Sequence, residues 1–288
     1  MISVIDLSQL PAPDVIEEIN FEDILQARKT ELIEHEGFSA EQRSDIAETL
    51  DRESEPLTKL LESAAYREMN LRQKINDQAR AILAAYASGS DLDHIGTTYY
   101  ATLRQDGESD QDYLRRMMLA PDSWSTAGSY QSYTYHALSA DPDIKDATAI
   151  NNGAGEVLVT VLTRSGDGVA TSPILTSVDN ALNAEKVRPL NDRPTIQSAD
   201  VVTFQVKAAL ELRDGPSADV VEDMAREAVR AYVDSRHRLG EDIVRGRILA
   251  ELYVEGVERV TLETPTTDIL RDKTQAAYCG GIEVSANG

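Results

Sequence analysis

The longest uninterrupted helical signal in the sequence runs from Leu57 to Ala87, without a single glycine or proline. Pro56 comes directly before it, where a first helical turn tolerates proline because the missing N–H has no intrahelical partner there. The run predicts one helix of roughly 30 residues, about 45 Å long at 1.5 Å per residue. The chain therefore begins with a helical region that has little strand signal.

One apolar stripe on this helix is expected to pack against other residues and so be shielded from water. Leu71, Ile75, Ile82 and Tyr86 share a face, while the basic residues lie largely elsewhere. Two explanations are open. The stripe packs on the preceding helices of the same chain, which we favour for most of it, or it joins a bundle with partner chains. The second explanation makes these four residues candidate partner-binding residues.

Shorter helices are predicted on both sides of the long run. Asn20 can cap a helix that ends near Gly37, and Ser39 with Gln42 forms a capping-box pattern. Ser109 with Asp112 forms a second capping signature, for a helix that is expected to stop before Pro121, and another helix is predicted to begin near residues 125–129.

Residues 88–108 are dense in turn and cap signals. Gly89 can end the long helix in a left-handed conformation, Ser90 or Asp91 can cap a short helix, and Gly96 can close it. We interpret this segment as an elbow between the long helix and the C-terminal part of the chain.

Strands appear only after Asp141. Residues 156–163 are β-branched and apolar on both faces, which indicates a buried strand, and residues 172–187 form an amphipathic helix pattern. Residues 201–213 alternate between apolar and polar, as expected for a strand buried on one side in an antiparallel or mixed sheet. Helices over 218–236 and 242–255, a strand over 257–262 and an edge strand over 280–284 complete the pattern.

These patterns predict an α+β protein, with an N-terminal helical region followed by two small α+β modules that have mixed or antiparallel sheets. The predicted boundaries are 1–140 for the helical bundle region, with its elbow near 88–108, then 141–199 and 200–288 for the two modules.

Composition limits the partners. The net charge of −22 opposes direct binding to nucleic acid, because most of the surface would repel phosphates. Residues 1–62 contain sixteen acidic and five basic residues, which suits either solubility or a basic partner. No apolar run is long enough for a membrane span, and the N-terminus lacks signal-peptide features, so we expect a cytoplasmic chain. The single cysteine, Cys279, excludes an internal disulfide.

The sequence contains no complete motif for catalysis, metal binding or cofactor binding. The glycines of residues 151–159 precede a strand, whereas phosphate loops follow one, and residues 164–172 lack the lysine of a phosphate loop. The acidic residues of 141–152 do not have calcium-loop spacing, and the four histidines have no metal-binding spacing. Cys279 is expected to be a packed residue. We therefore predict no enzyme activity, no cofactor and no metal site.

Ten segments in order resemble the baseplate J family of contractile phage tails, including P2-type tails, and of R-type phage-tail-like bacteriocins (pyocins). The segments are residues 5–25, 53–68, 89–96, 108–116, 125–147, 161–168, 187–199, 231–243, 254–265 and 273–279. The resemblance runs essentially end to end. One departure is the short loop between Leu103 and Glu108, which puts loop-specific contacts in doubt.

The resemblance implies a structural baseplate wedge component of a contractile injection system. It implies pairing with a second copy of itself and with a protein I type wedge subunit, within a hetero-oligomer of other wedge, hub and sheath-proximal proteins. It also implies a ring around the central hub, and a role in virion assembly and in triggering sheath contraction. Localisation would be the bacterial cytoplasm during assembly, then the tail baseplate of the virion or released bacteriocin. The alternative is a stand-alone α+β enzyme or small-ligand-binding protein.

Overall fold

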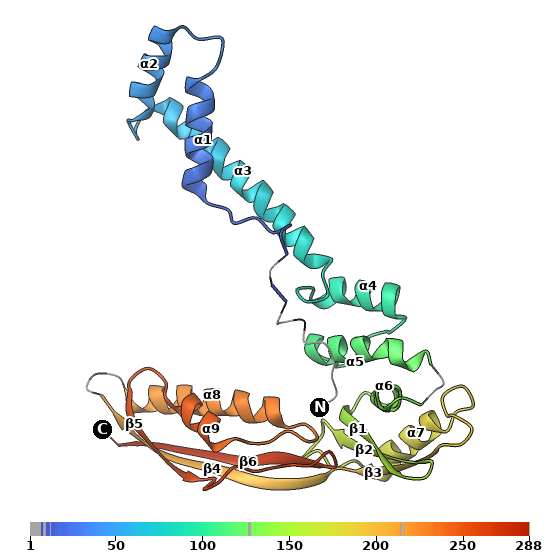
Figure 1. The fold of residues 1–288 in the computed structure, drawn as a ribbon. Coiled ribbons are helices and arrows are strands. Elements are labelled where there is room, and N and C mark those ends of the chain that lie inside the picture. Colours follow the sequence, from blue (N-terminus) through green and yellow to red (C-terminus); the bar gives the residue numbers. More distant parts are fainter. Residues whose placement is uncertain are drawn as a thin grey trace. The chain divides into compact units, whose positions relative to one another are not determined.

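The computed structural model describes residues 7, 10, 11, 13–125, 128–213, 215 and 217–287. The chain divides into two compact units, Ile5–Tyr99 and Tyr100–Gly288. The first unit is helical, and the second combines helices with two small sheets (Figure 1). The predicted α+β class, with a helical region followed by mixed sheets, is confirmed.

The helical unit begins with two short capped helices. In α1 (Phe21–Ile33) the side chain of Asn20 accepts a hydrogen bond from the backbone N–H of Glu22, and in α2 (Ala40–Leu50) Ser39 and Gln42 form the predicted capping box. These bonds satisfy backbone donors that have no partner within the helix. Both predicted helix starts are therefore confirmed.

The long helix is shorter than predicted. Helix α3 spans Pro56–Ala81, and Ile82 is already its C-terminal cap. Residues 83–87 form hydrogen-bonded turns instead, and Gly89 has the expected left-handed conformation with φ of 53°. Helix α4 (Gly89–Tyr100) continues through Gly96, so the prediction that Gly96 closes it is wrong. That glycine is buried within the helix.

Helix α3 packs on α1 through a mixed face, in which Leu61 and Met69 are partly buried beside fully buried small and polar residues. Its buried residues are Thr58, Ala65 and Asn76, and Ala65 packs with Ile24 and Leu25 of α1. The Asn76 amide binds the Glu17 backbone twice, since its Oδ1 accepts from the N–H at 3.0 Å and its Nδ2 donates to the carbonyl at 2.9 Å. This paired contact fixes the segment before α1 along the long helix.

The second unit starts with two helices, α5 (Asp110–Ser123) and α6 (Tyr130–Ala140). Ser109 caps α5 and Ser129 caps α6, each by accepting a backbone N–H three residues further on. Helix α5 contains Pro121, so the prediction that the helix stops before this residue is wrong. A proline this close to the C-terminal end removes little of the hydrogen-bond ladder, which explains why it is tolerated.

The first sheet has the order β1-β2-β3, with β1 (Ile144–Gly153) antiparallel and β3 (Arg193–Ser198) parallel to β2 (Glu156–Thr163). The predicted buried strand 156–163 is β2. Strands β1 and β3 were not anticipated. Helix α7 (Ser172–Leu182) connects β2 to β3 and is shorter than the predicted 172–187. The core of this sheet includes Tyr133 and Ala137 of α6 and Val159 and Val161 of β2.

The second sheet has the order β5-β4-β6, with β4 (Asp200–Leu212) in the middle, β5 (Val257–Thr264) antiparallel and β6 (Gln275–Asn287) parallel to it. Helices α8 (Ala218–Arg236) and α9 (Arg245–Leu252) cover it on one side, as Figure 1 shows. Helix α9 is shorter than predicted, and the edge strand β6 is longer than predicted. No described helix combines the length and the apolar character needed to cross a membrane.

The two sheets meet through a short segment of continuous chain. Only Ala199 separates β3 from β4, and it is buried with Leu162, Leu239 and Ala276 in a shared apolar cluster. The Thr148 hydroxyl of β1 also donates to the Lys273 carbonyl before β6, at 2.5 Å. Polar and apolar contacts thus both connect the sheets.

Candidate functional site: a charged junction

The predicted partner-binding residues lie on the surface of the helical unit. The exposed fractions of Leu71, Ile75, Ile82 and Tyr86 are 61%, 53%, 77% and 43%. Leu71 and Ile75 are on α3, while Ile82 and Tyr86 lie at and beyond its end. The favoured explanation, that earlier helices of this chain cover most of the stripe, is wrong. The face of α3 that packs on α1 is instead the mixed one described above.

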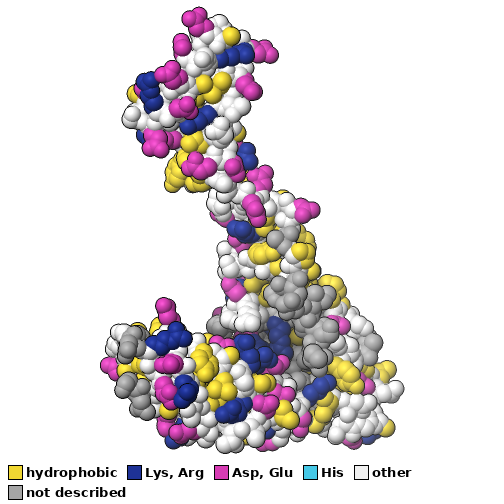
Figure 2. Space-filling view, turned by 60° about the vertical axis from the view of Figure 1, so that its left-hand side comes forward, with side chains coloured by type: hydrophobic (Ala, Val, Ile, Leu, Met, Phe, Trp, Pro, Cys, Tyr) yellow, Lys and Arg dark blue, Asp and Glu magenta, His cyan; other side chains and the backbone are white. Residues whose placement is uncertain are grey.

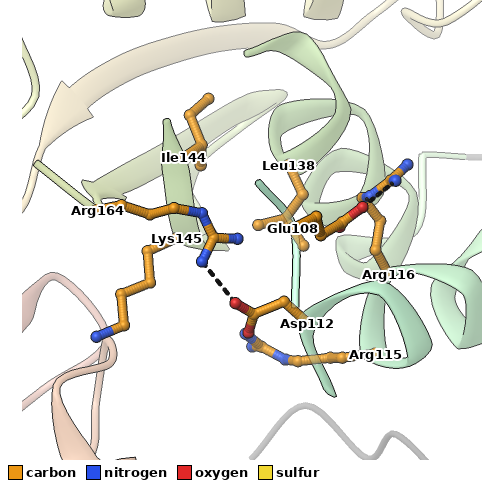
Figure 3. Close-up of a pocket in the computed structure, with 8 residues that line it drawn as sticks. All are labelled: Glu108, Asp112, Arg115, Arg116, Leu138, Ile144, Lys145 and Arg164. Atoms are coloured by element: carbon orange, nitrogen blue, oxygen red, sulfur yellow. Dashed lines mark hydrogen bonds and ion pairs between the residues drawn. The ribbon is translucent and has the colours of Figure 1, made fainter. Parts of the chain in front are cut away.

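A second candidate site lies in the sheet-containing unit, where α5 meets both sheets. Its centre is Asp112 in the first turn of α5. One carboxylate oxygen accepts a hydrogen bond from Arg164 Nη1 at 2.5 Å, and the other accepts from Arg238 Nη2 at 2.7 Å. Arg164 follows β2 and Arg238 follows α8, so one carboxylate connects three elements. Figure 3 shows the pair that Asp112 forms with Arg164.

The arginines keep Asp112 ionised. Burial alone would raise the pKa of this carboxyl group, but hydrogen bonds from Arg238 and Arg164 outweigh burial and lower the pKa below its ordinary value. Charge-assisted hydrogen bonds of this kind are stronger than neutral ones.

A second carboxylate, Asp146 of β1, fixes the chain after α8. It is 1% exposed, and its Oδ2 accepts the Leu239 N–H at 3.0 Å. Its Oδ1 accepts the Ala147 N–H at 2.9 Å and lies 2.8 Å from Arg115 Nη1. That Arg115 contact is an ion pair without hydrogen-bond geometry, because Nη1 has no hydrogen-bond partner among the described residues. Asp146 thus orders the backbone segment that follows α8.

A buried ion pair holds the segment before α5. Arg116 and Glu108 are each 4% exposed at the side chain, with contacts of 2.8 Å from Nε and 2.6 Å from Nη2. Arg116 Nη2 also donates to the Leu103 carbonyl at 2.7 Å, and the Tyr113 hydroxyl donates to the Thr102 carbonyl at 2.7 Å. The C-terminal part of the predicted elbow is therefore anchored to α5.

His237 lies beside this junction. Its Nδ1 is 2.8 Å from the Ala277 carbonyl oxygen of β6, and its ring contacts Tyr278 edge-on. Burial lowers the pKa of His237, which favours the neutral ring at pH 7. A methyl group at Gly168 would lie 3.0 Å from the His237 ring and 2.5 Å from Leu162. A larger residue at this position would require Leu162 to move.

A narrow cavity opens among these charges. Glu108, Asp112, Arg115, Arg116, Leu138, Ile144, Lys145 and Arg164 line it (Figure 3). Its interior volume of about 10 Å³ is the room that one water molecule needs. This cavity is too small to be a substrate site, so the junction is suited to holding elements together.

The described residues contain no group of three or more His, Cys, Asp or Glu side chains placed to hold a metal ion.

Cys279 is buried, and burial raises the pKa of its thiol. It is the packed residue that the sequence suggested, and a thiol with a raised pKa is a poor nucleophile at neutral pH.

Sequence reasoning missed the charged junction. Asp112 appeared only as part of a helix cap, Asp146 as part of an unsuitable calcium loop, and Arg164 as part of a glycine-rich loop. Arg164 and Arg238 are 52 and 126 residues from Asp112. One available signal was the acidic Asp146 next to the apolar positions of β1, since a charge in a buried strand needs a partner.

Comparison with known proteins places the chain in a family. Three family models match in order: the baseplate J-like N-terminal domain at residues 53–105, the baseplate J-like central domain at 125–198 and the baseplate J-like protein C-terminal domain at 204–285. The chain belongs to the baseplate J family. This baseplate J chain is also 44% identical to baseplate protein J of Escherichia phage P2, over 99% of this chain and 98% of that protein.

A solved structure with some likeness is the baseplate of the anti-feeding prophage. The match covers 63% of this baseplate J chain and 43% of that chain, at 13% identity and a TM-score of 0.41. A similarity this low carries no argument about fold or function. Family membership rests on the three family models and on the phage P2 protein.

Proposed function

We propose that the chain is a structural component of the baseplate wedge of a contractile phage tail or phage-tail-like bacteriocin. The observation that carries this is the match to baseplate protein J of phage P2 along nearly the whole of both chains. No reaction is part of the proposal. The role is to link wedge subunits into a ring around the central hub, in baseplate assembly and in triggering sheath contraction. The chain would be made in the bacterial cytoplasm and would act in the baseplate of the particle.

The two units supply different parts of this role. The helical unit presents apolar side chains to solvent, and Figure 2 shows hydrophobic side chains among charged ones on its visible face. Exposed apolar surface on a soluble protein marks an interaction site. We assign Leu71, Ile75, Ile82 and Tyr86 to a helical bundle with a second copy of this chain and with a protein I type subunit. The sheet-containing unit, whose elements Asp112 and Asp146 hold together, forms the ring segment.

The predicted elbow is suited to a hinge. Gly89, at the start of α4 within the helical unit, and Ala101, just after the unit boundary, both have positive φ, of 53° and 50°. Changes of a few backbone angles at such positions are enough to move two bodies relative to each other. We propose that contraction uses these positions, while residues 102–108 stay with α5 because their contacts are buried.

The first test is quantitative mass spectrometry of contractile particles purified from the producing strain, with the copy number of this chain compared with those of sheath and tube proteins. A structural wedge component is present in several copies per particle, in a multiple of six. Absence from intact particles would refute the proposal, and an assembly factor or the stand-alone protein would then be the explanation.

Charged substitutions in the apolar stripe test whether it binds the partner subunits. Leu71→Glu and Ile75→Glu should leave the isolated chain folded, because both side chains are more than half exposed. In the assembled wedge each change would bury a charge at an apolar contact, which costs several kcal/mol. We expect at least a tenfold loss in co-purification of the partner subunits, measured by size-exclusion chromatography of co-expressed proteins. Asn70→Asp is the control, since it adds the same charge at an exposed polar position of α3 that lies off the stripe. Normal assembly of the two stripe variants would exclude the stripe from the bundle.

A further inference from the structure

The charged junction contains more positive than negative groups. Five cationic side chains surround three buried or half-buried carboxylates: Arg115, Arg116, Lys145, Arg164 and Arg238 against Glu108, Asp112 and Asp146. This excess lies in a chain whose net charge is −22. The junction thus departs from the charge of the whole protein.

Three of the five cations have a carboxylate partner that accounts for them, whereas Arg238 and Lys145 do not. Arg116 is satisfied by Glu108 and the Leu103 carbonyl, and Arg164 by Asp112 and the Pro142 carbonyl. Arg115 has its ion pair with Asp146. Arg238 donates to Asp112 through Nη2, but its Nη1 is buried without a hydrogen-bond partner among the described residues. Lys145 forms no ion pair with any described carboxylate within 4.0 Å.

These two remaining cations lie close together, because Lys145 precedes Asp146 in β1 and Arg238 precedes Leu239, whose backbone N–H donates to Asp146 at 3.0 Å. Burial lowers the pKa of Lys145, and the charge of Arg238 lowers it further, against a raising effect of Asp234 and Asp112. Arg164 adds a smaller lowering effect, and His237 is the other titratable group that interacts with Lys145. A half-buried cation beside a second cation is unfavourable unless an anion is placed between them.

We propose that Lys145 and Arg238 bind an oxyanion, a carboxylate or a phosphate group, outside this cavity. The cavity interior holds only one water molecule and Arg238 does not line it, and in Figure 3 the Lys145 side chain points away from Asp112 and out of the cavity. A guanidinium edge and an ammonium group are the donors that proteins use for carboxylate and phosphate oxygens. The bound anion joins β1 to the segment after α8 and so reinforces the contact between the two sheets.

The anion has two possible sources with the same chemistry. It is either free inorganic phosphate or the carboxylate of an aspartate or glutamate side chain from a neighbouring subunit. The second source rests on the proposed baseplate function, whereas the first does not.

Phosphate binding is measured on the full chain by isothermal titration calorimetry and thermal unfolding, at constant ionic strength with chloride as the reference. We expect phosphate to raise the midpoint of unfolding by about 3 °C at concentrations roughly tenfold above its Kd. Lys145→Met should weaken phosphate binding at least tenfold, while Lys186→Met, which removes an exposed lysine of the same unit, should leave binding unchanged. Equal phosphate effects in both variants would count against the site.

The carboxylate source is tested in the assembled particle with a carbodiimide, which joins a lysine amine to a carboxylate that it touches. Mass spectrometry should find Lys145 joined to an aspartate or glutamate of another subunit, and Lys186 not joined in that way. A link only to Asp234 or Asp112 of the same chain would overturn the proposal, because the chain would then supply its own anion. Absence of both phosphate binding and a link between subunits would also overturn it, whereas the copy number of the chain per particle would be unaffected.

Discussion

Asp112 contributes both to a helix cap and to ion pairs. Its backbone N–H donates a hydrogen bond to the Ser109 side chain, which caps α5, while its carboxylate binds two arginines from distant parts of the chain. The cap could be predicted from sequence because it depends on residues three positions apart. The ion pairs could not, because nothing local indicates which of the many charged residues will meet.

Replacing Asp112 should destabilise the sheet-containing unit. Asp112→Asn keeps the shape of the side chain but leaves Arg164 and Arg238 without their shared counter-ion, which should lower the free energy of unfolding by about 2–4 kcal/mol. Denaturant unfolding followed by circular dichroism measures this. Asp223→Asn, which breaks an exposed ion pair with Arg226, should cost less than about 1 kcal/mol. Equal effects of the two changes would show that the junction adds no stability.

The same residue gives a pH dependence. The pKa of Asp112 is lower in the folded chain than its ordinary value, so the ionised group stabilises the fold at any pH above that ordinary value. This contribution is lost as the pH falls below about 4 and through the lowered pKa. We expect the difference in unfolding free energy between wild type and Asp112→Asn to shrink from pH 7 to pH 3. A difference that stayed constant over this range would contradict the assignment of the ion pairs.

At the scale of elements, local patterns predicted where most helices start but not where they end. Starts depend on a cap and a few following residues, as at Asn20, Ser39 and Ser109. The end of α3 at Ala81 and the continuation of α4 through Gly96 depend on packing, which no local pattern records. Strand β1 was missed because its sequence mixes polar and apolar residues, although its first half is almost fully buried.

The loop after β2 should tolerate substitution at one glycine and not at another. Gly166 and Gly168 both have positive φ, of 65° and 100°, so alanine costs about 1–2 kcal/mol at either position. A methyl group at Gly166 meets nothing within 4 Å, whereas at Gly168 it would collide with Leu162 and His237. Gly168→Ala should therefore lose about 1–3 kcal/mol more than Gly166→Ala in thermal unfolding. If both variants had the same stability, the loop would not be packed on the second sheet.

The whole molecule consists of two units whose boundary lies at Tyr99 and Tyr100. From sequence, the helical part was expected to extend to residue 140, with modules over 141–199 and 200–288. Those boundaries followed the change from helical to strand patterns. Periodicity cannot show that α5 and α6 pack on the first sheet, where Tyr133 and Leu119 share a core with Val159.

A fragment that begins at Tyr100 should fold alone and unfold in one transition. Its two sheets share the cluster of Leu162, Ala199, Leu239 and Ala276, and Asp112 and Asp146 contact both parts. Differential scanning calorimetry of the fragment should give a calorimetric enthalpy equal to the van't Hoff enthalpy. Two separate transitions would support the predicted modules 141–199 and 200–288 as independent domains.

The strand order of the second sheet affects how the protein is made. Strand β4 lies in the middle of the sheet, yet it precedes both of its neighbours in sequence, and β6 ends at Asn287. On the ribosome, the nascent chain therefore presents β4 with two unpaired edges until β5 has been synthesised, and with one unpaired edge until β6 has been synthesised. Unpaired edges are the usual starting point of aggregation. Truncation by even one C-terminal strand would leave one edge of β4 permanently open, so premature termination should yield insoluble protein.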